Sequence, residues 1–280
     1  MSVSTPTTSA PRSRALDAIS DWRVLTKRNL LTYIRKPDLL VFSTIQPVIF
    51  VLLFVFVFGG AFEQILPPEI SYVNFLMPGI FVQTAIFAAL QTGVGLADDL
   101  QKGLIDRFKS LPMARSAVLA GRTAADSISV IFQVILMLIV AYLVGYRLHE
   151  GLLESLLAFG LIVAIGYAFT WVAAFSGLSL KTIEAVQAAT FTIVFPVVFV
   201  SSAFVPVEFF RPWLQAVANN NPVTIWVDTA RALTLGELYT ESDFFADVPS
   251  LGTLLWQSAL WIAGILAVFW FLGVRNYRRT

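Results

Sequence analysis

The sequence predicts an all-α integral membrane protein with six transmembrane helices. Hydrophobic residues make up 57% of the 280 positions and charged residues only 13%, whereas about a quarter of the residues in an average soluble domain are charged. The apolar residues also occur in long runs, and a helix needs about 20 of them to cross a bilayer. The chain has no cysteine, which excludes disulfides and cysteine-based metal or nucleophilic sites.

The N-terminal region is predicted to lie outside the membrane core. Residues 1–14 are mostly Ser, Thr, Pro and Ala without periodicity, which indicates a disordered tail. Residues 15–37 place Trp22 and Tyr33 among arginines and lysines. A basic amphipathic helix with aromatic residues lies in the headgroup layer of a membrane. We therefore expect an interfacial helix that ends at Pro37.

Residues 38–280 are predicted to form one six-helix transmembrane domain. The polar segments between the apolar runs are short, except after the second and fifth runs. The predicted spans are residues 39–62, about 75–97, about 124–146, 152–180, 185–205 and 251–273. An even number of spans puts both termini on the same side of the membrane.

Positive charge indicates which side this is. Of the 19 lysines and arginines, all but Arg147, Arg211 and Arg231 fall in the segments that share one side with the termini. Segments rich in Lys and Arg stay in the cytoplasm. Both termini are therefore predicted to be cytoplasmic.

The polar interval between spans two and three is long enough to form a helix of its own. Apolar residues at spacings of three and four form one face that begins just before residues 98–112 and continues through them, namely Leu96, Leu100, Leu104, Phe108 and Leu111. Asp98 and Asp99 are predicted to begin this helix, and Pro112 to end it. The plainer interpretation is a loop helix on the membrane surface. The sharper one is a docking surface for a cytoplasmic partner.

The outer segment between spans five and six, residues 206–236, also contains helix signals. Pro212 suits the first turn of one short helix, and Asn221 can cap a second that ends before Gly236. Asp228 and Arg231 are three residues apart on this second helix and can pair. These helices are predicted to re-enter the outer leaflet, or alternatively to roof the bundle.

The chain lacks the motifs of several functional classes. No GxxxxGK[ST] motif is present, so the chain is not a P-loop ATPase on its own. The middles of spans one, four, five and six hold no carboxylate, Lys, Arg or His, which disfavours an ion-driven carrier. No Ser-His-Asp set, pair of intramembrane carboxylates or metal-ligand cluster is evident. We therefore expect neither an enzyme nor a metal site.

Three sequence stretches carry a family resemblance. They are MPGI at residues 77–80, QKGLIDRFKSLPMARS at 101–116 and NPVTIWVDTARAL at 221–233. With this layout the chain resembles the permease subunit of type-2 ABC exporters, of the daunorubicin-resistance kind, from about residue 21 to its end. Many members carry an acidic residue before the glycine of the second stretch, where this chain has Lys102.

The resemblance implies partners. Such permeases form homodimers or heterodimers in the bacterial cell membrane and join two cytoplasmic P-loop ATPase subunits, which bind ATP and Mg. The permease itself binds no cofactor and no nucleic acid. The ATPases contact the helix between spans two and three, here called the coupling helix, so its position implies these contact residues: Leu100, Leu104, Asp106, Arg107 and Phe108.

Two phenylalanine stripes are candidates for the substrate path. Each has helical spacing, one in span one and one in span five, and a glutamine in span two adds a polar group at membrane depth. The residues are Phe50, Phe54, Phe58, Gln83, Phe191, Phe195 and Phe199. An aromatic path with few charges suits a lipophilic or amphipathic drug, lipid or glycolipid. Packing and lipid contact are the alternative roles for such stripes.

The sequence is also compatible with other functions. A polysaccharide exporter of the same class would also carry aromatic residues along its path. A channel or scaffold subunit without energy coupling would use the interval after span two only for packing. An enzyme acting on lipids is disfavoured by the missing catalytic groups.

Overall fold

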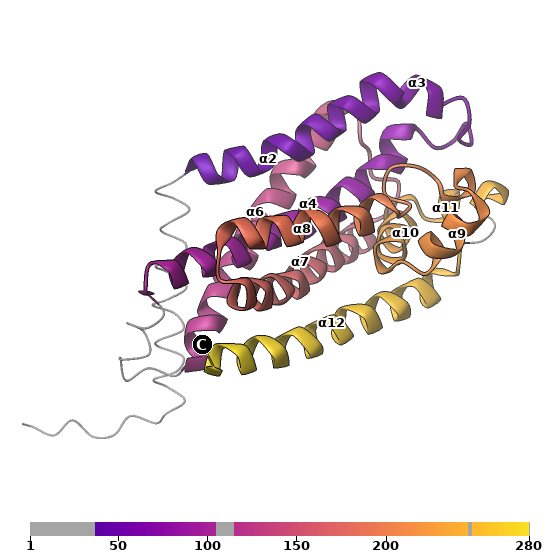
Figure 1. Cartoon of the computed structure of the whole chain (residues 1–280). Coiled ribbons are helices and arrows are strands. Elements are labelled where there is room, and N and C mark those ends of the chain that lie inside the picture. Colours follow the sequence, from indigo (N-terminus) through magenta and orange to yellow (C-terminus); the bar gives the residue numbers. More distant parts are fainter. Residues whose placement is uncertain (1–36, 105–114, 246–247, 280) are drawn as a thin grey trace, which may run out of the picture.

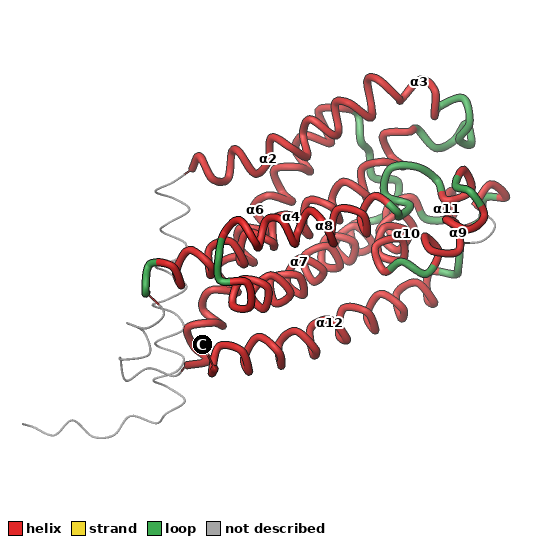
Figure 2. Tube along the Cα trace, in the orientation of Figure 1, coloured by secondary structure: helices red, strands yellow, loops and turns green. Residues whose placement is uncertain are grey.

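The computed structural model describes residues 37–104, 115–245 and 248–279, and this part of the chain is helical with no strand (Figure 2). The predicted tail lies outside these residues, as does the interfacial helix except for its last residue. Pro37, which was expected to end that helix, is instead the first residue of α2 (Pro37–Leu52). Proline suits a first helical position because its fixed φ is already helical and the missing N–H has no intrahelical partner there.

Five helical segments are long and apolar enough to cross a membrane. The first combines α2, a π-helical turn (Leu53–Phe58) and α3 (Gly59–Phe62). The others are α4 (Tyr72–Gln101), α6 (Arg115–Val144), α7 (Leu152–Leu180) and α12 (Leu251–Arg279). These helices correspond to the predicted spans one, two, three, four and six.

The predicted fifth span is shorter in the structure. Its helix α8 (Ile183–Phe199) has 17 residues and ends before the predicted Val205. The chain leaves the helix because the next residues are held elsewhere: the Ser202 amide donates to Thr224 Oγ1 at 3.2 Å, and the Ser202 carbonyl accepts from Arg231 at 2.6 Å. At 1.5 Å per residue α8 spans about 25 Å, less than the roughly 30 Å of a hydrocarbon core.

Helix α4 forms the centre of the bundle and packs most extensively against α7 (Figure 1). Two glycines allow the two backbones to approach closely. A Cβ added at Gly177 of α7 would clash with the Gly93 carbonyl oxygen, and one added at Gly93 would lie 2.6 Å from the Ala173 carbonyl oxygen. Small residues at such crossings let membrane helices pack by direct backbone contact.

Replacing Gly177 by alanine is expected to destabilise the bundle. The new methyl group meets backbone atoms, which cannot rotate away, so overpacking should cost about 1–3 kcal/mol. Gly160 on the same helix has no heavy atom within 4 Å of its Cβ position. Gly160→Ala is therefore the matched control and should leave the thermal unfolding midpoint in detergent unchanged or slightly higher. Equal midpoints for the two variants would contradict close α4–α7 packing.

The outer segment forms the short helices α9 (Pro212–Asn219), α10 (Pro222–Leu235) and α11 (Glu237–Thr240). They gather at the end of the bundle opposite to the C-terminus (Figure 1). The predicted helix signals are confirmed: Pro212 begins α9, the Asn221 side chain accepts from the Val223 amide at 2.9 Å, and Gly236 follows the last residue of α10. Helix α10 is almost wholly buried and packs against α4, α7 and α12.

At the opposite end, the start of the predicted coupling helix must be corrected. Residues 98–101 continue α4 and do not begin a separate helix. The last helical hydrogen bond runs from the Lys102 amide to the Asp98 carbonyl. The helix ends there because the next residue, Gly103, has a φ of +65°, a left-handed conformation that favours glycine. The rest of the predicted coupling helix lies mainly in residues 105–114, outside the described part of the chain.

Candidate functional sites at the two ends of the bundle

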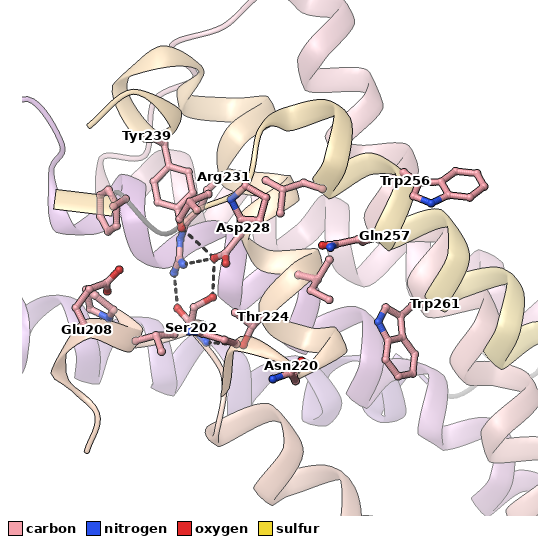
Figure 3. A pocket seen from close by; sticks show the side chains of 18 of the residues that line it. Ser202, Glu208, Asn220, Thr224, Asp228, Arg231, Tyr239, Trp256, Gln257 and Trp261 are labelled. Atoms are coloured by element: carbon pink, nitrogen blue, oxygen red, sulfur yellow. Dashed lines mark hydrogen bonds and ion pairs between the residues drawn. The ribbon is translucent and has the colours of Figure 1, made fainter. Parts of the chain in front are cut away.

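Arg231 is fully buried in the outer segment and connects three parts of the chain (Figure 3). Its Nε donates to the Phe75 carbonyl of α4 at 2.9 Å, and one terminal nitrogen donates to the Ser202 carbonyl at 2.6 Å. The other terminal nitrogen lies 3.2 Å from the Asp228 carboxylate. The guanidinium also lies 3.6 Å from the centre of the Phe75 ring. These contacts offset the large cost of burying a cation.

Asp228 completes this polar network. Its Oδ1 accepts hydrogen bonds from the Ser202 hydroxyl at 2.7 Å and the Tyr239 hydroxyl at 2.9 Å, in addition to the one from Arg231. The predicted pairing of Asp228 with Arg231 is thus confirmed. Burial raises the pKa of the Asp228 carboxyl, while the Arg231 charge and these hydrogen bonds act to lower it. The network fixes the segment after α8 against α10.

A pocket of about 410 Å³ lies beside this network. It is bounded by α10, the first turns of α12 and the segment around η2 (Val207–Phe209). Its walls combine charged, amide and indole groups. They include Asp228, Arg231, Glu208, Asn220, Gln257 and Trp261 (Figure 3).

The two predicted phenylalanine stripes meet near the outer segment. Phe50 of α2 lies 5.7 Å from Phe199 of α8 between ring centres, and Phe54 lies 4.8 Å from Phe204. Phe204 also stacks on Phe199 at 4.8 Å, and Phe195 lies 4.1 Å from Phe199. We call these five residues the phenylalanine cluster. Phe204 was not among the predicted residues because it follows the end of the helical periodicity.

The remaining candidate path residues lie apart from this cluster or at its edges. Phe58 and Phe191 are exposed at the far ends of their stripes, with 41% and 56% of their surface uncovered by this chain. Gln83 is buried in α4, and its Oε1 has no hydrogen-bond partner among the described residues. A role of these residues in substrate movement stays a prediction.

At the other end of the bundle, Arg122 of α6 joins two carboxylates. One terminal nitrogen lies 2.7 Å from Asp99 of α4, and Nε lies 3.1 Å from Asp126 on its own helix. The guanidinium crosses α4 over Gly95, where a Cβ would clash with it. Because Asp99 and Arg122 flank residues 105–114, this ion pair joins the two ends of that segment. We call these three charged residues the Arg122 clamp.

Of the predicted ATPase contacts, the structure describes only two. Leu100 is half-buried and packs against the apolar cluster of Leu96, Leu119 and Trp171. Leu104 is half-buried just beyond the turn at Gly103. Asp106, Arg107 and Phe108 lie outside the described residues. The coupling role of all five stays a prediction.

Comparison with known families decides the class of the chain. The family described as ABC-2 type transporter matches residues 20–235. The chain belongs to the ABC-2 type transporter family. The match includes both the Arg122 clamp and Arg231, so both ends of this ABC-2 permease belong to the shared region.

Individual relatives are permeases. The daunorubicin resistance ABC transporter permease protein DrrB1 of Streptomyces coeruleorubidus is 30% identical over 90% of this chain and 83% of its own length. The putative transport permease ycf38 of Cyanophora paradoxa is 26% identical over 93% and 89%, respectively. A probable doxorubicin resistance ABC transporter permease protein, DrrC of Mycobacterium tuberculosis, is 23% identical over 90% and 87%. With its long apolar helices, this ABC-2 permease is a multi-pass membrane protein.

Removing the central cation of the Arg122 clamp should destabilise the ABC-2 permease. Arg122→Gln removes the cation that donates to Asp99 and to Asp126, which is 2% exposed, and lost hydrogen bonds to charged groups cost about 1.5–3 kcal/mol. Lys102→Gln is the control at the same end, because the Lys102–Asp98 pair at 2.6 Å is exposed and such pairs contribute about 0–1 kcal/mol. Thermal unfolding in detergent compares the two. A smaller loss for Arg122→Gln than for Lys102→Gln would contradict the assignment.

Proposed function

We propose that this chain is the membrane permease subunit of an ATP-driven exporter, which moves a lipophilic or amphipathic drug, lipid or glycolipid out of the cytoplasm or the inner leaflet. The observation that carries the proposal is the ABC-2 match over residues 20–235. Relatives named for daunorubicin or doxorubicin resistance support an amphipathic drug as one cargo.

Energy comes from a separate subunit in this proposal. The chain contains no phosphate-binding loop of its own, so two cytoplasmic P-loop ATPase subunits bind ATP and Mg and dock on the coupling helix. The Arg122 clamp supports this arrangement, because the ion pair at 2.7 Å ties α4 to α6 on either side of that segment. A movement of the coupling helix would therefore be transmitted to α4 and α6 together.

A second permease copy, identical or paralogous, completes the proposed transporter. Among the five membrane-length segments, the first and last are the least covered by the rest of the described chain: only 17% of the most apolar stretch of the α2–α3 span and 11% of that of α12 are buried. These faces are available to lipid and to the second copy.

The cargo is proposed to pass along the phenylalanine cluster. Its rings come from α2, the π-helical turn that follows α2, α8 and the segment after α8, so the cluster lies where separate elements meet. An aromatic surface of this kind contacts lipophilic cargo without strong hydrogen bonds, which would slow release.

Isolation of the chain from its native membrane in nanodiscs tests the proposal. A soluble P-loop ATPase should co-purify, and adding ATP to reconstituted vesicles should drive uptake of daunorubicin. Absence of any ATPase partner would favour the channel or scaffold function. An ATPase partner together with transport of glycans alone would favour polysaccharide export.

The proposed orientation in a bacterial cell membrane, with cytoplasmic termini, gives a direct prediction. Because the chain has no cysteine, single cysteines can be placed at Asn220 in the outer segment and at Gln101 near the Gly103 turn, both exposed. A membrane-impermeant maleimide added to intact cells should label Asn220→Cys and leave Gln101→Cys unlabelled until the membrane is opened. The reverse pattern would invert the topology.

A further inference from the structure

The pocket beside Asp228 presents an unused carboxylate oxygen. All three hydrogen bonds of this side chain fall on Oδ1. The second oxygen, Oδ2, accepts none from the described residues, although Asp228 lines the pocket. Oδ2 is also not one of the fully buried side-chain atoms that lack a hydrogen-bond partner among the described residues. An anionic acceptor thus faces the cavity.

The cation of the pocket is not available to a ligand. Each of the three guanidinium nitrogens of Arg231 already donates to a group of the protein, and one guanidinium face covers the Phe75 ring at 3.6 Å. The side chain has no exposed surface. Arg231 therefore has no exposed donor that could bind a phosphate, sulfate or carboxylate in the pocket.

The other lining residues include groups that suit a cation. Two acidic residues, Asp228 and Glu208, line the pocket together with the single base Arg231. Gln257 adds an amide that has no hydrogen-bond partner among the described residues, and Figure 3 shows this amide directed from α12 toward Asp228. Trp261 adds an indole ring, and tryptophan is the best side chain for cation–π contact.

We propose that this pocket binds the ammonium group of an amphiphile, with the cation between Asp228 Oδ2, Gln257 and Trp261. The apolar part of the ligand extends along α12, where Leu260 is 56% exposed. The ammonium group can belong to an exported molecule or to the headgroup of an outer-leaflet lipid. Only the first of these sources depends on the proposed export function.

Calorimetric titration of the purified chain in dodecyl maltoside tests the site without any ATPase. Benzyltrimethylammonium is the cationic probe, and benzenesulfonate is an anionic probe of similar size. The cation should bind with one site per chain, and the anion should not bind. Equal binding of both probes, or no binding of the cation, would overturn the proposal while leaving export untouched.

Substitutions of Gln257 should move the affinity in both directions, because this residue is not part of the Asp228–Arg231 network. Gln257→Glu should tighten binding of the cation about 3-fold or more, and Gln257→Lys should weaken it about 10-fold or more, as expected for a charge placed near the ligand. The same changes at Gln187, an exposed residue of α8, are the matched controls and should have no effect. If the affinity for the cation is the same with Gln, Glu or Lys at position 257, the proposed site is wrong.

Competition then identifies the source of the ammonium group. Phosphatidylethanolamine and phosphatidylglycerol are added in turn to the micelles. Displacement of the probe by phosphatidylethanolamine alone assigns the site to a lipid headgroup. Displacement by daunorubicin but by neither lipid assigns it to cargo. Displacement by phosphatidylglycerol to the same degree would contradict recognition of ammonium.

Discussion

Replacing Leu104 and Phe108 together by aspartate is expected to abolish ATP-driven transport while leaving the chain inserted in the membrane. Both residues belong to the apolar face predicted for the coupling helix, and an aspartate in an apolar contact loses its hydration without gaining a partner. A cost of at least about 3 kcal/mol would weaken binding of the ATPase about 100-fold or more. Co-purification of the ATPase and uptake into vesicles measure the two effects.

The control keeps the same positions apolar. Leu104→Met with Phe108→Leu changes shape but adds no charge, and it should retain the ATPase. Size-exclusion chromatography of both variants after extraction from the membrane checks whether insertion and folding are intact. Normal transport by the double aspartate variant would remove the docking assignment, whereas loss of the ATPase in the conservative variant would indicate a requirement for shape and not for apolar character.

The second large effect is expected from Asp228→Ala. This change leaves the buried guanidinium of Arg231 without its counter-ion, and breaking a buried ion pair from one side costs about 3–5 kcal/mol. It also removes the acceptor of the Ser202 and Tyr239 hydroxyls. We expect the thermal unfolding midpoint of the purified chain to fall sharply, with much of the protein lost during extraction.

Three further variants separate charge from packing. Asp243→Ala removes an exposed carboxylate from the same outer end and should have little effect. Tyr239→Phe removes one hydrogen bond and should cost about 1 kcal/mol. Asp228→Leu combined with Arg231→Met should recover only part of the loss, because the carbonyls of Phe75 and Ser202 lose their donor. Full stability of Asp228→Ala would show that Arg231 does not need this partner.

Local signals in the sequence predicted local structure well. The capping of α10 by Asn221 and the pairing of Asp228 with Arg231 involve residues within a few positions of each other, so their geometry follows from helical spacing alone. The bounds of α7 also agree with the predicted fourth span, because polar turns at both ends mark where the apolar run begins and ends.

Contacts between distant segments could not be predicted in this way. Arg122 and Asp99 lie on different helices, and hydropathy does not tell how two helices rotate toward each other. The phenylalanine stripes were visible as spacing, but the addition of Phe204 depends on a turn after α8 that ends the helical pattern early. The early end follows from hydrogen bonds to α10 that only the folded bundle forms.

The contacts of Arg231 have a consequence for the order in which the protein assembles. The chain is synthesised from its N-terminus at about 5–20 residues per second, and Arg231 follows its acceptor Phe75 by 156 residues. About 8–30 seconds therefore separate the appearance of the acceptor from that of its donor. During this interval α4 can already pack against α7, but the outer end cannot close. Completion of the outer end is thus a late event in biogenesis. In a nascent chain that stops before position 231, the outer end would stay open and accessible to quality-control proteases.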